Sequence, residues 1–399
     1  TNFNPLIHTF LLGGLFKFGY TLGNQNFGLF LYTIIQLSIV ISVFAYTIVY
    51  LKKAKVHDNF VIGALLIYAL IPVFPFYAMT AVKDVIFSSL IVLYVIKLYN
   101  LLKNEQTIKD YIILGLIILL VTLFRNNGIY TIVLSFPALF FILSKSRKPL
   151  IIVFFVNVLF YIAYNNVLLP YFKIPNTSIR EALSIPFQQT ARYVKYHGDD
   201  VTEEERKIID HILEYDTLAE NYQPDLSDPV KNKYNKYTTR EELKQYFNVW
   251  FKMFFRHPSA YFDATISNVY GYFYPNTSRW YIYYRMNPNM VKDGFDYHYI
   301  DSLEFGRNIL IGIGEAFPYV PIVGLIVNIG VIVWIYLLIL VILIVNKNSK
   351  YITVILPALS IILACVAGPV NTYFRYILPI LFALPPTVSL LYFELKQRV

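Results

Sequence analysis

The chain has little charge and almost no cysteine. Charged residues make up 15% of its 399 residues, whereas hydrophobic residues make up 57%, which is more apolar surface than a soluble fold of this length needs to bury. The single cysteine, Cys365, lies in an apolar run, which excludes an intrachain disulfide and argues against thiol catalysis or a cysteine-based metal site. The composition therefore predicts an all-α polytopic membrane protein.

Several motifs of soluble enzyme classes are also missing. The sequence has no phosphate-binding glycine loop, no HExxH and no convincing Ser-His-Asp spacing. Its six histidines are scattered along the chain, so no dedicated zinc site is expected. The formal net charge of +9 would suit nucleic acid, but Lys and Arg form short clusters between apolar runs, where they act as topology signals. We therefore expect no nucleic-acid partner.

Apolar runs near the length of a membrane span predict about nine visible transmembrane helices. They fall at 27–51, 59–78, 84–102, 109–124, 128–144, 149–168, 320–345, 351–368 and 374–394. Successive helices are expected to cross the membrane in opposite directions. The C-terminal tail then lies on the same side as the Lys- and Arg-bearing segments that follow the first, third, fifth and seventh helices. The positive-inside rule makes that side cytoplasmic. The visible chain is predicted to start outside and to cross the membrane an odd number of times. This predicts one further span before Thr1, and ten or more transmembrane helices in the full chain.

Polarity along the chain predicts three parts. Residues 1–168 form an N-terminal transmembrane module that starts with an external juxtamembrane segment, 1–26. Residues 169–319 are polar enough to fold as an extracytoplasmic domain, and residues 320–399 form a C-terminal transmembrane module.

The external domain is predicted to be mainly helical. The stretches TEEERKIIDHILEYD, from Thr202, and TTREELKQYFNVWFKMFF, from Thr238, each begin with Thr followed three residues later by Glu. This capping-box arrangement satisfies free amides in a first helical turn. Both stretches then continue with helical apolar spacing.

Lys83 and Asp84 interrupt the run YAMTAVKDVIFSSLIVLYVI, residues 77–96, where each ionisable group is expensive to bury. Near the start of the predicted helix 84–102, free backbone amides and the helix dipole favour an ionised Asp84, and Lys83 can extend toward the headgroups. The pair is therefore either a helix cap or part of a catalytic or ligand-binding site.

The external turn in LFRNNGIY, residues 123–130, holds Arg125, Asn126 and Asn127. Asn and Gly suit a simple hairpin. However, an external arginine runs against the positive-inside bias, and two neighbouring amides offer groups that bind phosphate or sugar hydroxyls. Both interpretations stay open.

A third polar cluster lies in GPVNTYFRYILP, residues 368–379, where Arg375 and Tyr376 begin the last predicted helix. An interfacial Arg-Tyr pair commonly anchors a helix, but a guanidinium at this depth can also bind a lipid phosphate in a bidentate manner. The three polar clusters are all predicted to lie on the same face of the membrane. Helix caps that act separately would not need to share one face.

Gln188, Gln189 and Arg192 follow soon after the chain leaves the membrane, in SIPFQQTARYVKYH, residues 184–197. An amphipathic surface helix explains them as well as a ligand site does.

Four features together resemble the membrane glycosyltransferases of the GT-C superfamily. They are the run NPLIHTFLLGGLFKFGYTLGN (4–24), the Lys-Asp pair at 83–84, the external domain after six visible helices, and RYILP at 375–379. The resemblance is closest to bacterial enzymes of the protein mannosyltransferase and aminoarabinose-transferase type.

This resemblance implies a sugar donor linked to a polyprenyl phosphate. A carboxylate in the first external loop would act as general base, and it is expected upstream of Thr1 because residues 1–26 contain no Asp or Glu. Asp84 matches a later acid that orients the acceptor or a divalent cation, Mg²⁺ or Mn²⁺. Arg375 matches the basic residue near the lipid phosphate.

The predicted function is transfer of a sugar from a polyprenyl phosphate to a cell-envelope glycan, lipid or protein at the outer face of a bacterial cytoplasmic membrane. The predicted catalytic acid, and the metal ligand if a metal takes part, is Asp84. Donor phosphate would be bound by Lys83, Arg125, Arg375 and Tyr376. Sugar or acceptor would be bound by His8, Asn126, Asn127, Gln188, Gln189 and Arg192.

Other functions fit parts of the pattern. A polysaccharide polymerase or ligase also uses a large external loop and arginines, on lipid diphosphates. A transporter or flippase of lipid-linked sugars would place ionisable groups near mid-membrane and break helices in matched halves, which the sequence does not show. A non-catalytic scaffold is a third possibility.

Overall fold

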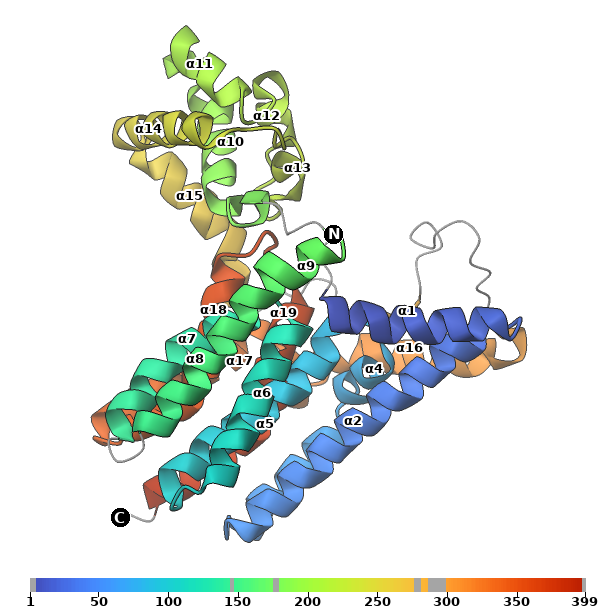
Figure 1. Cartoon of the computed structure of the whole chain (residues 1–399). Helices are drawn as coiled ribbons and strands as arrows, with labels where there is room; N and C mark the ends of the chain where they lie inside the picture. Colours follow the sequence, from blue (N-terminus) through green and yellow to red (C-terminus); the bar gives the residue numbers. More distant parts are fainter. Residues whose placement is uncertain (1–4, 144–146, 175–178, 276–280, 286–298, 397–399) are drawn as a thin grey trace. The chain divides into compact units, whose positions relative to one another are not determined.

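The computed structural model describes residues 5–143, 147–174, 179–275, 281–285 and 299–396. These residues form helices joined by short connections, with three isolated β-bridges and no strand (Figure 1). The chain divides into two compact units. Unit 1 comprises Thr1–Asn176, Trp280–Ile362 and Phe374–Val399, and unit 2 comprises Thr177–Arg279 and Leu363–Tyr373.

Unit 1 is built from apolar helices. Its α-helices are α1 (Leu6–Thr21), α2 (Gln25–Lys53), α3 (Asp58–Leu70), α4 (Val73–Met79), α5 (Lys83–Lys103), α6 (Ile108–Phe124), α7 (Gly128–Ile142), α8 (Arg147–Ala163), α9 (Leu169–Tyr171), α16 (Glu304–Ala316), α17 (Ile329–Val345), α18 (Ile352–Val366) and α19 (Phe374–Lys396). The last residues of α18 belong to unit 2. A π-helical turn, Tyr164–Leu168, joins α8 to α9.

Within the described residues, five helical segments are long and apolar enough to cross a membrane: Gln25–Lys53, Lys83–Lys103, Arg147–Tyr171, Ser349–Val366 and Phe374–Lys396. A sixth is the bent pair α3 and α4 if it forms one span. The chain is therefore an all-α membrane protein, as predicted. The predicted count of about nine spans is too high, although each predicted run contains a helix.

Length and proline explain the difference in the count. The predicted run 59–78 bends by 53° between α3 and α4, where Pro72 lacks an amide hydrogen. Helices α6, α7 and α17 have 17, 15 and 17 residues, fewer than the roughly 20 that span a bilayer core. The predicted run 320–345 begins with a short 3-10 segment, Val323–Val327, so its α-helix starts only at Ile329.

Helix α5 is the central helix of unit 1, since side chains on all its faces are buried. It packs against α2, α6 and α19. Helices α5 and α19 run parallel, because Asp84 meets Arg375 at their N-terminal ends and Lys103 pairs with Glu394 at their C-terminal ends. The two polar ends of α5 are separated by roughly 28 Å along the helix, which is close to the hydrocarbon thickness of a bilayer.

Helices α1 and α2 form a tight hairpin within the predicted juxtamembrane segment and the first predicted span (Figure 1). A Cβ atom on Gly28 would lie 2.4 Å from the carbonyl oxygen of Leu15, so only glycine permits this approach. Gly23 in the connecting turn has φ +71°. Asn24 caps α2 by accepting a hydrogen bond from the amide of Phe27.

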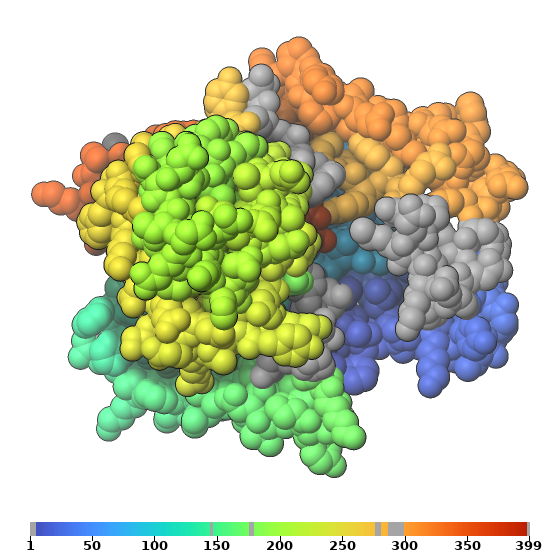
Figure 2. All heavy atoms as spheres, turned by 90° about the horizontal axis from the view of Figure 1, so that it is seen from above, coloured from blue at the N-terminus to red at the C-terminus, as the bar shows by residue number. Residues whose placement is uncertain are grey.

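Unit 2 is a small helical body that appears in green and yellow in Figure 2, apart from its segment Leu363–Tyr373. Its α-helices are α10 (Ser184–His197), α11 (Glu203–Asp210), α12 (Tyr215–Asn221), α13 (Asp228–Lys231), α14 (Arg240–Arg256) and α15 (Pro258–Val269). Fully buried Phe187, Tyr193, Tyr246 and Tyr261 lie in one core.

Two capping boxes begin helices of unit 2. Thr202 and Glu205 form the box of α11 as predicted. The second box uses Thr239 and Glu242, one residue later than the Thr238 start expected from the sequence. The mainly helical character predicted for this part of the chain is confirmed for the described residues.

Unit 2 differs in extent from the predicted domain 169–319. Its continuous part is Thr177–Arg279, and Trp280 onward groups with unit 1. The distant segment Leu363–Tyr373 completes it. Asn371 holds this segment by accepting a hydrogen bond from the amide of Gly271 at 3.0 Å and donating one to the carbonyl of Ser267 at 3.2 Å.

Candidate functional site

Asp84 lies in the first turn of α5 and is fully buried. Its Oδ1 atom lies 2.8 Å from Nη1 of Arg125, and its Oδ2 atom lies 3.7 Å from Nε of Arg375. The two guanidiniums come from the end of α6 and the start of α19. Three polar clusters that are far apart in the sequence therefore meet at one end of the central helices of unit 1.

Local backbone structure brings Arg125 to this position. Arg125 is the C-cap of α6, with extended φ −153° and ψ 124°, so the chain leaves the helix there. Gly128 starts α7 in close contact with α6, because a Cβ atom on it would lie 2.4 Å from the carbonyl oxygen of Val121. The guanidinium of Arg125 then lies over the rings of Phe87 and Tyr376, each 5.3 Å from the ring centroid.

The contact between Asp84 and Arg125 is an ion pair. The two groups are close, but neither oxygen of Asp84 has an aligned hydrogen bond among the described residues. A buried carboxylate is expensive unless it is paired, and the two guanidiniums supply that compensation. The arginine side chains keep 14% and 23% of their surface exposed, so a molecule from outside can reach them although it cannot reach Asp84.

Lys83 directly precedes Asp84 in the first turn of α5, and its charge acts on His8. Burial, followed by the charge of Lys83, lowers the pKa of His8 to about 4, while Asp84 acts in the opposite direction. His8 is therefore neutral near pH 7.

A chain of hydrogen bonds connects His8 to the segment that precedes α5. Nε2 of His8 is 3.0 Å from the hydroxyl oxygen of Tyr32, which itself donates to Oε1 of Gln36 at 2.7 Å. Because a tyrosine hydroxyl has one hydrogen, His8 must be the donor, so its proton is on Nε2. Gln36 in turn donates to the carbonyls of Ala78 and Thr80, at 2.9 and 2.8 Å, and so fixes the connection that leads into α5.

Sequence reasoning missed Tyr32 and Gln36. Both are fully buried on α2, inside a run that hydropathy marks as membrane-spanning. A glutamine in the middle of such a run was an available signal, because an amide there needs hydrogen-bond partners.

Asn126 and Asn127 lie next to Arg125, in the turn between α6 and α7. Asn126 is half-buried and Asn127 is exposed at the N-cap of α7, where its side chain makes no capping hydrogen bond. Tyr376 also belongs to the cluster, since the guanidinium of Arg375 lies 5.7 Å from its ring centroid. The predicted donor-site residues of unit 1 are thus neighbours.

The three predicted residues of α10 instead stabilise the interior of unit 2. Gln188 donates to the carbonyl of Gln223, and Gln189 donates to the hydroxyl of Thr265 at 2.9 Å. Arg192 bonds Tyr222 and pairs with Asp263 at 2.9 Å. Both glutamines are buried, so these residues have structural partners within their own unit.

The fold and the cluster define a helical membrane protein with a buried carboxylate and two arginines at one end of its central helices. The chain belongs to the family described as "Family of unknown function (DUF6020)", whose model matches residues 1–398. Comparisons with curated proteins and with solved structures give no match.

Proposed function

We propose that the protein is a glycosyltransferase that takes a sugar from a polyprenyl-phosphate donor, with the lipid phosphate bound at Arg125 and Arg375. The observation that carries the proposal is the pair of partly exposed guanidiniums held on the fully buried Asp84. Each guanidinium has several N–H donors in a planar fork that matches phosphate oxygens.

The depth of the cluster supports a lipid ligand. Asp84 and Arg375 lie in the first turns of two helices that are candidate membrane spans. A polyprenyl chain can lie in the bilayer while its phosphate reaches this end of the helices. The positions of Lys52, Lys53 and Lys396 at the other ends of α2 and α19 favour an extracytoplasmic site through the positive-inside rule.

In this proposal Asp84 is a positioning residue. Its burial and its ion pairing argue against direct proton transfer, because a general base must reach the acceptor hydroxyl. It holds the arginines where the leaving phosphate gains charge, and stabilising that charge accelerates transfer. Lys83 and Tyr376 complete the phosphate site, and Asn126 and Asn127 would bind sugar or phosphate oxygens.

A polysaccharide polymerase or ligase is a second candidate, since two guanidiniums on one carboxylate also suit a lipid diphosphate. Donor identity separates the two. A lipid monophosphate carrying one sugar supports the proposed transferase, whereas exclusive use of a diphosphate carrying an oligosaccharide supports the alternative.

The test is a transfer assay with the full protein in proteoliposomes, using a panel of radiolabelled polyprenyl-phosphate sugars and a membrane extract as acceptor. Binding of unglycosylated polyprenyl phosphate is measured in parallel. We expect Arg375→Ala and Arg125→Ala to weaken phosphate-lipid binding at least tenfold and to abolish transfer. Arg206→Ala is the matched control, because Arg206 forms an exposed ion pair in unit 2. Wild-type behaviour of both site variants would refute the site, and absence of both binding and transfer in the wild type would refute the function.

A further inference from the structure

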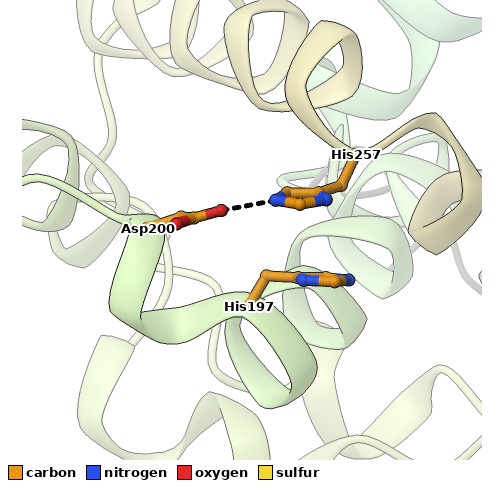
Figure 3. Close-up of side chains that lie close together, drawn as sticks. All are labelled: His197, Asp200 and His257. Atoms are coloured by element: carbon orange, nitrogen blue, oxygen red, sulfur yellow. Dashed lines mark hydrogen bonds and ion pairs between the residues drawn. The ribbon is translucent and has the colours of Figure 1, made fainter.

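Unit 2 gathers three potential metal ligands from distant parts of its sequence. His197 ends α10, Asp200 ends the 3-10 turn Gly198–Asp200, and His257 lies between α14 and α15. One ligand atom from each lies within 4.8 Å of the others. Figure 3 shows the imidazole of His257 directed at the carboxylate of Asp200, with the ring of His197 beneath it.

The two imidazoles and the carboxylate are in direct contact. Nε2 of His257 and Oδ2 of Asp200 are bonded to each other. The rings of His197 and His257 stack, with centroids 3.9 Å apart and planes 10° apart. One nitrogen of each ring and one oxygen of Asp200 therefore lie close enough together to meet at a single ion.

Neighbouring contacts hold the ligands in place without help from an ion. Nη1 of Arg256 donates to the carbonyl of Asp200 at 2.6 Å, and Nη2 donates to both carboxylate oxygens of Glu205 at 2.8 Å. These bonds fasten the turn that carries Asp200 to the end of α14, one residue before His257. The ligand positions are therefore preorganised, which reduces the entropic cost of binding an ion.

Tyr193 supplies a second, independent observation. It is fully buried, and its ring centroid lies 5.6 Å from that of His197 and 5.5 Å from that of His257. Its hydroxyl has no hydrogen-bond partner in the part of the chain that the structure describes. A buried hydroxyl normally has a partner, and a water molecule bound to a metal beside these rings would provide one.

We propose that unit 2 binds one divalent transition-metal ion of the zinc class through His197, Asp200 and His257. Two imidazoles and one carboxylate suit Zn²⁺ and its neighbours better than Mg²⁺ or Ca²⁺, which prefer oxygen ligands. Tetrahedral zinc places its ligand atoms roughly 3.4 Å apart, so the two stacked rings must turn out of their parallel arrangement for both to reach one ion. Asp200 and His257 then exchange their mutual bond for bonds to the ion.

The site would remain open to solvent. The side chains of Asp200 and His257 are 50% and 32% exposed, and three protein ligands leave at least one coordination position for water or a substrate. This proposal is independent of the glycosyltransferase proposal, since it concerns unit 2 alone.

The experiment uses the full-length protein in detergent after treatment with a chelator. Zn²⁺ is titrated by calorimetry, and Co²⁺ is titrated by visible absorption because its bands report the coordination geometry. We expect saturable binding of one ion per chain and a higher unfolding temperature with Zn²⁺. His197→Gln, Asp200→Asn and His257→Gln should each weaken Zn²⁺ binding by at least about tenfold.

His211→Gln is the matched control. His211 also pairs with a carboxylate of unit 2, Glu242, at 3.3 Å, so its replacement should leave Zn²⁺ affinity unchanged. His197→Gln decides the result if the other two variants fail to fold, because among the described residues the side chain of His197 contacts its neighbours through its ring. No saturable binding by the wild type, or equal affinity in His197→Gln and His211→Gln, would overturn the proposal.

Discussion

The carboxylate of Asp84 lies 2.8 Å from the guanidinium of Arg125 in a position that water does not reach. This pair joins the start of α5 to the end of α6, and Arg375 adds the start of α19. One carboxylate thus connects three helices at the same end of unit 1. Each charge depends on the others for compensation, because a lone buried charge is strongly destabilising.

Asp84→Asn should destabilise unit 1 by about 3–5 kcal/mol, since it leaves two guanidiniums without their carboxylate. The measurement is the unfolding temperature in detergent. Asp84→Asn combined with Arg125→Met should recover part of the loss, because the cluster then holds one fewer unpaired charge. Glu203→Gln, which removes an exposed ion pair with Arg206, should change stability by less than about 0.5 kcal/mol. Equal stability of Asp84→Asn and wild type would contradict this account.

Gly28→Ala should open the α1–α2 hairpin. Its Cβ atom would lie 2.4 Å from a backbone oxygen of α1, and we expect a loss of about 2–3 kcal/mol. Gly13→Ala is the matched control, since nothing lies within 4 Å of its added Cβ atom and alanine favours the helix by up to about 1 kcal/mol. Hydrogen exchange of α1 amides distinguishes the variants, and equal protection in both would show that the close approach is unimportant.

Gln36→Leu should loosen the connection before α5. The substitution removes the donor to the carbonyls of Ala78 and Thr80, and unsatisfied buried carbonyls cost about 1–3 kcal/mol. Ser38→Ala on the same helix is the control, because Ser38 is exposed and bonds only its own helix. Proteolysis of the segment before α5 provides the readout, and equal rates in the two variants would count against the role of Gln36.

Acid should weaken the packing of α1 through His8. Its pKa is about 4 when packed and 6.5 when free, so the free histidine takes up a proton that the packed one does not. The stabilisation by neutral His8 is complete above pH 6.5 and is lost as the pH falls toward 4, by about 2 kcal/mol at pH 5. Exchange of α1 amides, corrected for the intrinsic effect of pH, should rise between pH 7.5 and 5. His8→Gln should abolish this dependence, and its persistence in that variant would assign the effect to another group.

The sequence predicts much of this architecture because membrane helices have strong signals in hydropathy. The alternation of helices also put Lys83, Asp84, Arg125 and Arg375 on one face, and the structure brings Asp84, Arg125 and Arg375 into contact. The number of spans could not be obtained in this way. Hydropathy does not register the bend at Pro72 or the shortness of α7, which decide whether an apolar run crosses a bilayer.

The sequence pattern did not predict which distant residues of unit 2 come into contact. The histidines looked scattered, and a dedicated zinc site was not expected. His197 and Asp200 are separated by one helical turn, but His257 reaches them only through the packing of α14 and α15 onto the core and the bonds of Arg256. Such proximity depends on how helices cross, and a single sequence does not encode that in its periodicity.

The segment Leu363–Tyr373 has a consequence for biosynthesis. It supplies Asn371, which binds Gly271 and Ser267, yet the ribosome makes it long after the rest of unit 2. Domains generally fold as they emerge from the ribosome, and the core of unit 2 lies within the part that is made first. The contacts of Asn371 can form only after α17 and α18 have been synthesised, so a nascent chain that stops after α17 lacks them.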